Sequence, residues 1–596
     1  MTAPTATDDT FPADRTEADL VIRVLGALLR EDVVGLRSAG TPTEGQDGAW
    51  LRRTAGNGRS LLVPVTADGF QCECAARLPL IRAESDNGTS VIHGTCDAIL
   101  TELRALAEPA DREGFDAFAV ECRQTLGTMR LHAATRGQVM GELTDRHGHD
   151  LAAWQGAAGA LAFDTLAARL DHPVYPTARG RSGLGDTQLR SYAPEFHSRF
   201  ALRWLAVPRD AVTGEFPHAW PTPARLGLDG LDRTHVVMPV HPLTVGADLE
   251  DALGEKGLTD RVAVPVGTSG AEAVPTLSMR TVALTCDPTL HVKVPLPTAT
   301  LGLRNRRTIK PGTLVDGAAG QRLIERIVAL EPRLRDTVLH ADETVHAHAG
   351  HELLAVLFRR LPAGLDDCLV VPMAALLAEA PDGRLVFDHL ADLFHDGDTA
   401  ALLDACLTPL FDWQTTLFGY GVALESHQQN ISLVLDRYAD GRPRVRLLLK
   451  DNDGPRVNTV RLRERLGDDA PESLGFDDPR TFGTSDGPVA DLFTTITLHL
   501  CAGALAFGLA RHGRAPLPEL LRLVRDRLAE AVERLGTEPG GPGDVLRTRV
   551  LEAPRLPVKA MVTAGTLLSK ERSGATDINK HYTSGPNYLL RQGRSV

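Results

Sequence analysis

Residues 275–284 read PTLSMRTVAL and residues 291–296 read HVKVPL, and both segments have the alternating pattern of a β-strand. Successive side chains of a strand point to opposite faces, so Ser278 and Arg280 are expected on one face, opposite the apolar residues between them. The second segment alternates equally well. We therefore predict a β-rich middle part of the chain, built around these two strands.

The orientation of Lys293 depends on the loop between the two strands. A four-residue loop at residues 286–289 places Lys293 on the same face as Arg280, and a loop one residue longer or shorter reverses it. Arginine, lysine and hydroxyl groups on one sheet face suit a polyphosphate or a polycarboxylate. The alternative is a solvent-exposed face with ordinary salt bridges. Further polar residues follow the second strand: Thr300, Arg304, Arg306, Arg307 and Lys310.

A second candidate site combines ESHQQN at residues 425–430 with KDND at residues 450–453. The two strand-like segments between them are joined by Asp-Gly at residues 440–441, which is a strong hairpin signal. A hairpin brings Asp451 close to Asn430, and their oxygen atoms suit Mg²⁺ bound to the phosphates of a nucleotide, as in protein-kinase-like folds. The alternative is a polar hairpin stabilised by its own side chains.

A third segment, HPVYPTARGRSG at residues 172–183, combines rigid prolines, glycines and arginines. Such a composition is compatible with an anion-binding loop that includes His172 and Arg179, although an ordinary surface loop has similar residues. YAPEF at residues 192–196 and PVHP at residues 239–242 are not specific when taken alone.

Composition sets limits on the function. The chain has 596 residues, of which 43% are hydrophobic and 24% charged, as in ordinary globular proteins. Its formal net charge of −13 repels nucleic acid, so a polyanionic ligand requires a local basic pocket. The sequence contains no Walker A motif, no strand-linked GxGxxG, no GxSxG and no HExxH, which disfavours the enzyme classes that use them.

Cysteine and histidine usage indicates neither disulfides nor zinc. The eight scattered cysteines include no CxxC pair and are interpreted as free thiols in a reducing cytoplasm. His340, His346, His348 and His351 crowd one segment without zinc-ligand spacing, so we interpret it as a solvent-exposed helix or loop. Residues 1–14 do not resemble a signal peptide, and no apolar stretch is long enough to span a bilayer. We expect a cytoplasmic protein without membrane or nucleic-acid partners.

The order of the predicted elements indicates an α+β protein of three parts. Residues 1–165 are mainly helical, with a small sheet within residues 43–80. Residues 166–390 form a β-rich part, in which helices return over residues 320–410. Residues 391–596 contain the hairpin and two later helices.

Taken in chain order, these segments resemble the IucA/IucC family, the NRPS-independent siderophore synthetases. The resemblance runs from about residue 172 to about residue 587, and its most specific parts are Thr300-x-x-x-Arg304 and the HxQN core. It implies a cupped α+β fold of three subdomains, likened to thumb, fingers and palm, with a kinase-like nucleotide site in the palm. The three predicted parts of the chain correspond to these subdomains.

The resemblance also implies the chemistry. ATP and Mg²⁺ would activate a citrate-like polycarboxylic acid as its acyl adenylate, and an amine or hydroxyl would then form an amide or ester. Members are often homodimers, but no feature of this sequence decides the oligomeric state. Matching positions assign His427, Arg304 and Thr300 to catalysis, Ser278, Arg280, Lys293, Arg304, Gln429, Asn430 and Asp451 to ATP, Asn430 and Asp451 to the metal, and His172 and Arg179 to a mobile substrate loop.

The chain departs from the family pattern at several positions. Tyr175 and Arg179 stand where His and Lys are common, and Lys450 stands where Arg is usual. PVHP is followed by Leu-Thr at residues 243–244 instead of Trp-Gln. The nucleotide site is kept while the substrate loop is altered. Two other hypotheses stay open: a kinase-like phosphotransferase, based on the hairpin, and a non-catalytic scaffold or metabolite-binding protein of a biosynthetic cluster.

Overall fold

The chain begins with an amphipathic helix, α1 (Arg15–Arg30), as its apolar spacing predicts. Asp14 caps the helix by accepting a hydrogen bond from the backbone N of Thr16 at 2.9 Å. Leu20 and Val24 are fully or almost fully buried on its inner face. The computed structural model describes residues 14–55, 58–67, 69–86, 88–265, 270–452, 454–468, 473–569 and 581–591.

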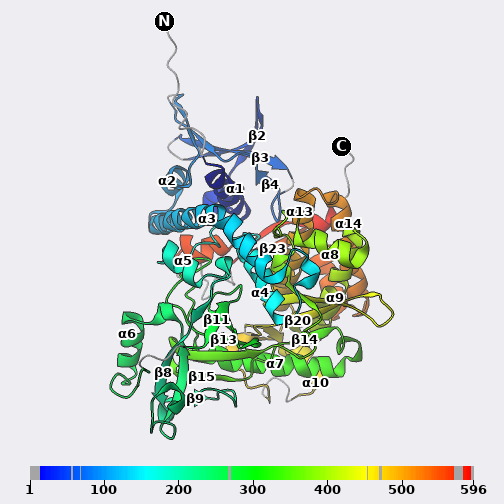
Figure 1. Cartoon of the computed structure of the whole chain (residues 1–596). Helices are drawn as coiled ribbons and strands as arrows, with labels where there is room; N and C mark the ends of the chain where they lie inside the picture. Colours follow the sequence, from blue (N-terminus) through cyan, green and yellow to red (C-terminus); the bar gives the residue numbers. More distant parts are fainter. Residues whose placement is uncertain are drawn as a thin grey trace.

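The rest of the N-terminal part contains further helices and a six-stranded sheet, which extends beyond the predicted residues 43–80. Its strands are ordered β1-β2-β3-β5-β6, and β4 pairs with β3. In Figure 1 this sheet lies at the end of the molecule that carries the N-terminus, and the long helix α3 crosses beside it. The elements are β1 (Thr41–Gly45), β2 (Gly48–Thr54), β3 (Ser60–Ala67), β4 (Cys74–Ala76), β5 (Ile81–Glu84), β6 (Ser90–His93), α2 (Cys96–Leu106), α3 (Arg112–His147) and α4 (Gly156–Ala168).

The middle part is built on a seven-stranded sheet of order β7-β11-β12-β13-β16-β15-β9, beside a two-stranded sheet of β10 and β8. Strands are frequent here, as expected for residues 166–390. The elements are α5 (Asp186–Tyr192), β7 (Phe200–Ala201), β8 (Arg203–Pro208), β9 (Thr213–Gly214), β10 (His235–Val240), α6 (Ala247–Glu255), β11 (Glu272–Pro275), β12 (Thr281–Leu284), β13 (Asp287–Lys293), α7 (Pro311–Leu330), β15 (His346–His351) and β16 (Leu354–Arg360).

The predicted continuous strand over residues 275–284 is wrong in its first half. Residues 276–280 form a turn between β11 and β12, in which Met279 has a φ of +62°. The predicted register is also wrong by one residue, because Thr281 pairs with Lys293. A two-residue connection and a bulge after Ala283 replace the expected four-residue loop.

The predicted hairpin is confirmed and belongs to a four-stranded sheet of order β14-β20-β19-β17. Helices were expected throughout residues 320–410, but strands interrupt them after α7, because β14 adds to this sheet in parallel with β20 while β15 and β16 join the seven-stranded sheet. The remaining elements are β14 (Val338–His340), β17 (Leu369–Pro372), α8 (Val386–His395), α9 (Thr399–Gly419), β19 (Ile431–Arg437) and β20 (Pro443–Leu449).

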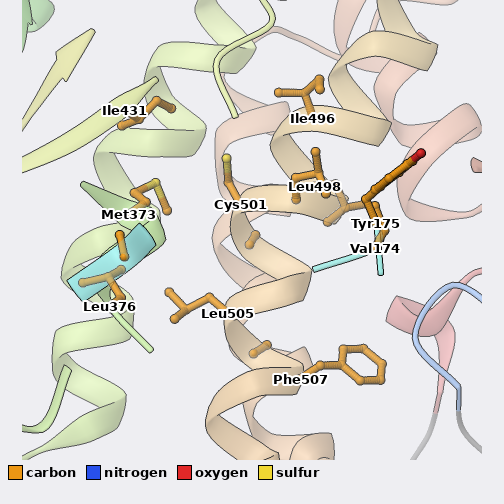
Figure 2. Close-up of a cluster of buried hydrophobic side chains, with 14 of the residues drawn as sticks. Val174, Tyr175, Met373, Leu376, Ile431, Ile496, Leu498, Cys501, Leu505 and Phe507 are labelled. Atoms are coloured by element: carbon orange, nitrogen blue, oxygen red, sulfur yellow. The ribbon is translucent and has the colours of Figure 1, made fainter. Parts of the chain in front are cut away.

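The C-terminal part packs around one long apolar helix, Gly487–Arg511. The expectation that no apolar stretch is long enough to span a bilayer is wrong for this helix, but its most apolar window is entirely buried inside the protein. Figure 2 shows Ile496, Cys501 and Leu505 of this helix beside Met373 and Leu376. It is therefore a core helix. The other elements are β18 (Val422–Ala423), β21 (Arg456–Asn458), α10 (Thr459–Leu466), β22 (Phe482–Gly483), α14 (Leu517–Glu533), α15 (Pro542–Leu546), β23 (Arg555–Lys559) and β24 (Tyr582–Pro586), and the long helix comprises α12 (Gly487–Leu492), a π-helical stretch (Phe493–Gly503) and α13 (Ala504–Arg511).

Candidate functional site

One large cavity, of about 1000 Å³, lies where the middle and C-terminal parts of the chain meet. Thirteen Lys or Arg residues line it, against seven Asp or Glu residues. The chain as a whole carries a formal charge of −13, so positive charge is concentrated at this cavity. Such a cavity suits an anion with several charges.

The structure brings every residue predicted for the site to this one cavity. The contributing segments are distant in sequence and include the 172–183 loop, the turn before β12, the segment after β13 and both ends of the hairpin. Their individual roles stay predictions. The lining residues are His172, Arg179, Ser278, Arg280, Lys293, Thr300, Arg304, His427, Gln429, Asn430 and Asp451.

Ser278 and Arg280 reach the cavity from the turn and not from a strand face. The Ser278 hydroxyl accepts a hydrogen bond from the backbone N of Thr281 at 3.1 Å and donates to the hydroxyl of Thr281 at 2.9 Å. The Arg280 guanidinium donates to the carbonyl of Thr308 at 2.6 Å. These bonds fix the turn, so both side chains are positioned by local geometry.

Lys293 and Asp451 form an ion pair at the centre of the cavity, with 2.5 Å between Nζ and Oδ1. Arg359 lies 3.8 Å from the same oxygen. Burial alone would raise the pKa of Asp451, but Lys293, Arg359 and Arg280 together hold it well below its ordinary value. Asp451 is therefore ionised at neutral pH, with cations of three separate segments directed at it.

Two residues that support Asp451 were missed by the sequence interpretation. Glu343 accepts hydrogen bonds from the backbone N of Asp451 at 2.8 Å and from Nε of Arg359. Both side chains are buried, with exposed fractions of 1% for Glu343 and 3% for Arg359. The only available signal was an arginine pair that ends an apolar segment at residues 354–360.

The turn before β19 orients His427 and Asn430. The Asn430 side-chain amide donates to the carbonyl of Glu425 at 3.1 Å, which leaves its oxygen for a ligand. The Nδ1 atom of His427 accepts from the backbone N of Gln429 at 3.3 Å, so Nε2 carries the ring hydrogen. Burial lowers the pKa of His427, against the opposing charges of Glu425 and Asp451. His427 is therefore a neutral hydrogen-bond donor at neutral pH.

Thr300 and Arg304 lie in the segment that follows β13. The hydroxyl of Thr300 accepts from Nε of Arg307 at 2.6 Å. Burial, together with the nearby charge of Arg280, lowers the pKa of Arg307 to about 9. Arg304 donates to the carbonyl of Ala564 at 3.1 Å, which links this segment to the C-terminal part of the chain.

The predicted mobile loop is anchored in this structure. The Nδ1 atom of His172 accepts from the backbone N of Tyr175 at 3.0 Å, and burial, with His427 nearby, lowers its pKa to about 3. Arg179 pairs with Asp171 at 2.6 Å. Both predicted loop residues are thus held at the cavity wall.

Glu121 of α3 connects three segments that border the cavity. Its carboxylate accepts hydrogen bonds from the hydroxyls of Tyr175 and Thr177 at 3.2 and 3.0 Å. It also accepts from the backbone N of Leu303 at 3.2 Å and from the hydroxyl of Thr566 at 2.5 Å. One buried carboxylate therefore fixes the loop, the segment after β13 and the 563–567 turn together.

We expect Glu121→Ala to lower the free energy of unfolding by about 2 to 4 kcal/mol, because it removes the acceptor of four hydrogen bonds, three of them from the buried residues Tyr175, Thr177 and Thr566. Chemical denaturation followed by circular dichroism measures the change. Glu113→Ala on the exposed side of the same helix is the matched control and should change little. Equal stability of the two variants would contradict the anchoring role of Glu121.

Three predicted features lie away from the cavity or differ from expectation. His241 of PVHP is buried against the rings of Tyr192 and Phe200, with centroid distances of 5.4 and 4.9 Å. Glu195 of YAPEF pairs with Arg181 at 2.7 Å and only supports the cavity wall. Asp453 of KDND is outside the described residues.

The prediction of a solvent-exposed helix or loop for the histidine-rich segment is wrong, because this segment contributes to β14 and β15. Strand pairing with β20 and β16 explains the difference, since an alternating His-Ala pattern fits a half-buried strand. Across the described ranges, no three His, Cys, Asp or Glu side chains cluster as metal ligands would.

Comparison with solved structures identifies the class of fold. Petrobactin biosynthesis protein AsbB from Bacillus anthracis superposes with a TM-score of 0.73 at 17% identity, covering 96% of this chain and 95% of that protein. ATP-bound aerobactin synthetase IucA from Klebsiella pneumoniae superposes with a TM-score of 0.66 at 20% identity, covering 96% and 100%. The fold is thus the predicted cupped synthetase fold.

Sequence comparison then gives the family. Residues 160–378 match the IucA/IucC family, and residues 399–573 match the family described as ferric iron reductase FhuF-like transporter. The predicted resemblance to the IucA/IucC family is thus confirmed by the match over residues 160–378.

Three curated relatives show how far the similarity extends. Protein y4xN of Sinorhizobium fredii is 27% identical over 63% of this chain and 64% of its own length. Staphyloferrin A synthase of Staphylococcus aureus is 24% identical over 50% and 53%. The L-2,3-diaminopropanoate–citrate ligase of the same organism is 28% identical over 19% and 21%. The chain thus matches less than two thirds of the length of each of these relatives.

Proposed function

We propose that this chain is an ATP-dependent synthetase of siderophore biosynthesis, which adenylates a citrate-like polycarboxylic acid and joins it to an amine or hydroxyl. The observation that carries the proposal is the cation-rich cavity to which all the predicted site residues contribute. The similar proteins named aerobactin synthetase, staphyloferrin A synthase and petrobactin biosynthesis protein support the reaction class. The ATP-bound IucA structure supports ATP as the nucleotide.

In the proposed first step, a carboxylate oxygen of the acid attacks the α-phosphorus of ATP, and the bond to the β-phosphate breaks with release of pyrophosphate. Two anions must meet in line for this step. Arg280, Lys293, Arg304 and Arg307 would bind the phosphates and the acid, and would offset their charge within the cavity. Thr300 is held beside this group by Arg307.

In the proposed second step, the amine or hydroxyl attacks the acyl carbon, the bond to AMP breaks, and the attacking group loses one proton. Negative charge grows on the acyl oxygen as the attack proceeds. His427 lines the cavity and its Nδ1 is already an acceptor, so its Nε2–H would donate to that oxygen. Arg304 would stabilise the same charge.

The hairpin fits a magnesium ion in its donor chemistry. Asn430 directs its amide nitrogen to Glu425 and keeps its oxygen for a ligand, and Asp451 is held ionised. These two residues would hold Mg²⁺, which would supply charge neutralisation to the triphosphate. Lys293 shares the carboxylate of Asp451, so it would bridge the metal site and the phosphates.

Hydroxylamine trapping tests the proposed function. We expect the full chain, with ATP, Mg²⁺ and a panel of di- and tricarboxylic acids, to form hydroxamate, pyrophosphate and AMP with at least one acid. Formation of ADP without AMP would indicate a kinase-like phosphotransferase instead. If no acid yields hydroxamate or pyrophosphate, the activating role is wrong and the scaffold hypothesis is favoured. The proposal includes a cytoplasmic location, because ATP is the substrate.

A further inference from the structure

Part of the cavity wall is an apolar groove that the proposed mechanism does not use. It follows one face of the long helix, where residues four apart line the cavity. Their side chains become smaller along the helix, and the side chain of Leu377 packs against the backbone at Gly508, so the groove narrows there. The residues are Ile496, Leu500, Ala504 and Gly508.

The opposite wall of the groove is formed by Met373, Ala374 and Leu377. Both walls are attached to the turn that carries His427. The backbone N of Ala374 donates to the carbonyl of Gln428 at 3.1 Å. On the helix, Cys501 donates to the carbonyl of Ser426 at 3.4 Å. The groove therefore starts beside the residue proposed to act on the acyl group, and Figure 2 shows Met373 facing the helix there.

The groove ends at a positive charge. Arg511, the last residue of α13, lines the cavity and has no hydrogen-bond or ion-pair partner among the described residues. The residue is exposed, and the partial desolvation that lowers the pKa of its guanidinium is opposed by no carboxylate. Three residues further on, Arg514 pairs with Asp388 at 2.6 Å and does not line the cavity. The guanidinium of Arg511 is thus available to an anion in the cavity.

A different apolar wall is available to the adenosine of ATP. Ile309, Leu314 and Leu357 form a buried cluster that also lines the cavity. This cluster adjoins Thr308, whose carbonyl accepts from Arg280. A nucleotide whose phosphates are bound at Arg280 can therefore place its base against this wall, which leaves the groove to another substrate.

We propose that the groove binds the attacking amine or alcohol, and that this substrate has an aliphatic spacer ending in a carboxylate bound by Arg511. This inference rests on the proposed function. From Leu500 to Arg511 the helix rises about 16 Å, which exceeds the size of a compact citrate-like acid. Apolar walls suit methylene groups, and the planar guanidinium fork suits a carboxylate. The groove would thus select the nucleophile by length and by terminal charge.

Calorimetry on the full chain tests the proposal directly. The probes are a series of ω-amino carboxylates with alkylamines and α,ω-diamines of equal length. We expect the best ω-amino carboxylate to bind at least about tenfold more tightly than the alkylamine of equal length. This difference is the size expected for one charge-assisted hydrogen bond between the carboxylate and Arg511. Arg511→Gln should abolish the difference, and Arg511→Glu should reverse it in favour of the diamine.

Controls separate this proposal from general damage. Arg514→Gln removes the same charge at the same helix end outside the cavity and should leave the preference unchanged. Ala504→Leu should shift the preference to shorter spacers, and the affinity for ATP should be the same in all variants. Equal binding of carboxylate and alkylamine by the unmodified chain, or weakened ATP binding in Arg511→Gln, would overturn the proposal. Hydroxamate formation reports on the proposed function independently, because hydroxylamine does not require the groove.

Discussion

Asp451→Asn is expected to lower acid-dependent pyrophosphate release by about 10²- to 10³-fold. The carboxylate of Asp451 pairs with Lys293 and Arg359, and the charge of Arg280 also acts on it. Asparagine has nearly the same shape but no charge, so the cations lose their common partner and the proposed metal site loses its only anionic ligand. Pyrophosphate release measured across a range of Mg²⁺ concentrations checks the prediction, and the variant should require more Mg²⁺.

The matched control is Asp440→Asn at the other end of the same hairpin, where the carboxylate is exposed and pairs with Arg442. Its pyrophosphate release should stay within about twofold of the unmodified chain, since exposed ion pairs contribute little. If Asp451→Asn releases pyrophosphate at the same rate as Asp440→Asn, the hairpin does not bind the metal nucleotide.

The hairpin shows which part of the site was predictable from sequence. Its strands have clear alternation and an Asp-Gly turn, so the proximity of Asn430 and Asp451 follows from short-range geometry. Ser278 and Arg280 were correctly predicted to belong to the site, but they were expected on a strand face and lie in a turn. A turn with a positive φ at Met279 interrupts an alternating segment, and alternation alone does not reveal such a break.

Long-range contacts were the part that sequence could not provide. Glu343 and Arg359 support Asp451 only because β16 of the seven-stranded sheet and the segment before β15 lie against the end of the hairpin. Glu121 accepts hydrogen bonds from Leu303, which is 182 residues further along the chain, and from Thr566, which is 445 residues further. No local pattern around these residues distinguishes them from surface acids, because their partners are set by tertiary packing.

His427→Ala is expected to lower hydroxamate formation by about 10²- to 10³-fold while the affinity for ATP changes little, since the proposed role of the ring is to donate to the acyl oxygen. His427→Gln retains an N–H donor and should recover part of the activity. Single-turnover kinetics with saturating ATP separates the loss of chemistry from a loss of nucleotide binding.

The lowered pKa of His427 also predicts in which direction a change of pH reduces the activity. Burial lowers the pKa of His427, so the neutral ring is present at neutral pH and is lost as the pH falls through that lowered pKa. If the neutral ring of His427 is the active form, the unmodified chain should lose activity in acid, at a pH below the ordinary histidine pKa of about 6.5. Glutamine does not titrate, so His427→Gln should lack this loss.

His389→Gln provides the control, because His389 of α8 pairs with Asp382 and does not line the cavity, so this variant should keep the acid-side loss. A His427→Gln protein that loses activity at the same pH as the unmodified chain would assign the titration to another group. In that case, His427 would orient phosphate without acting on the acyl oxygen, and its removal would weaken ATP binding instead of the chemical step.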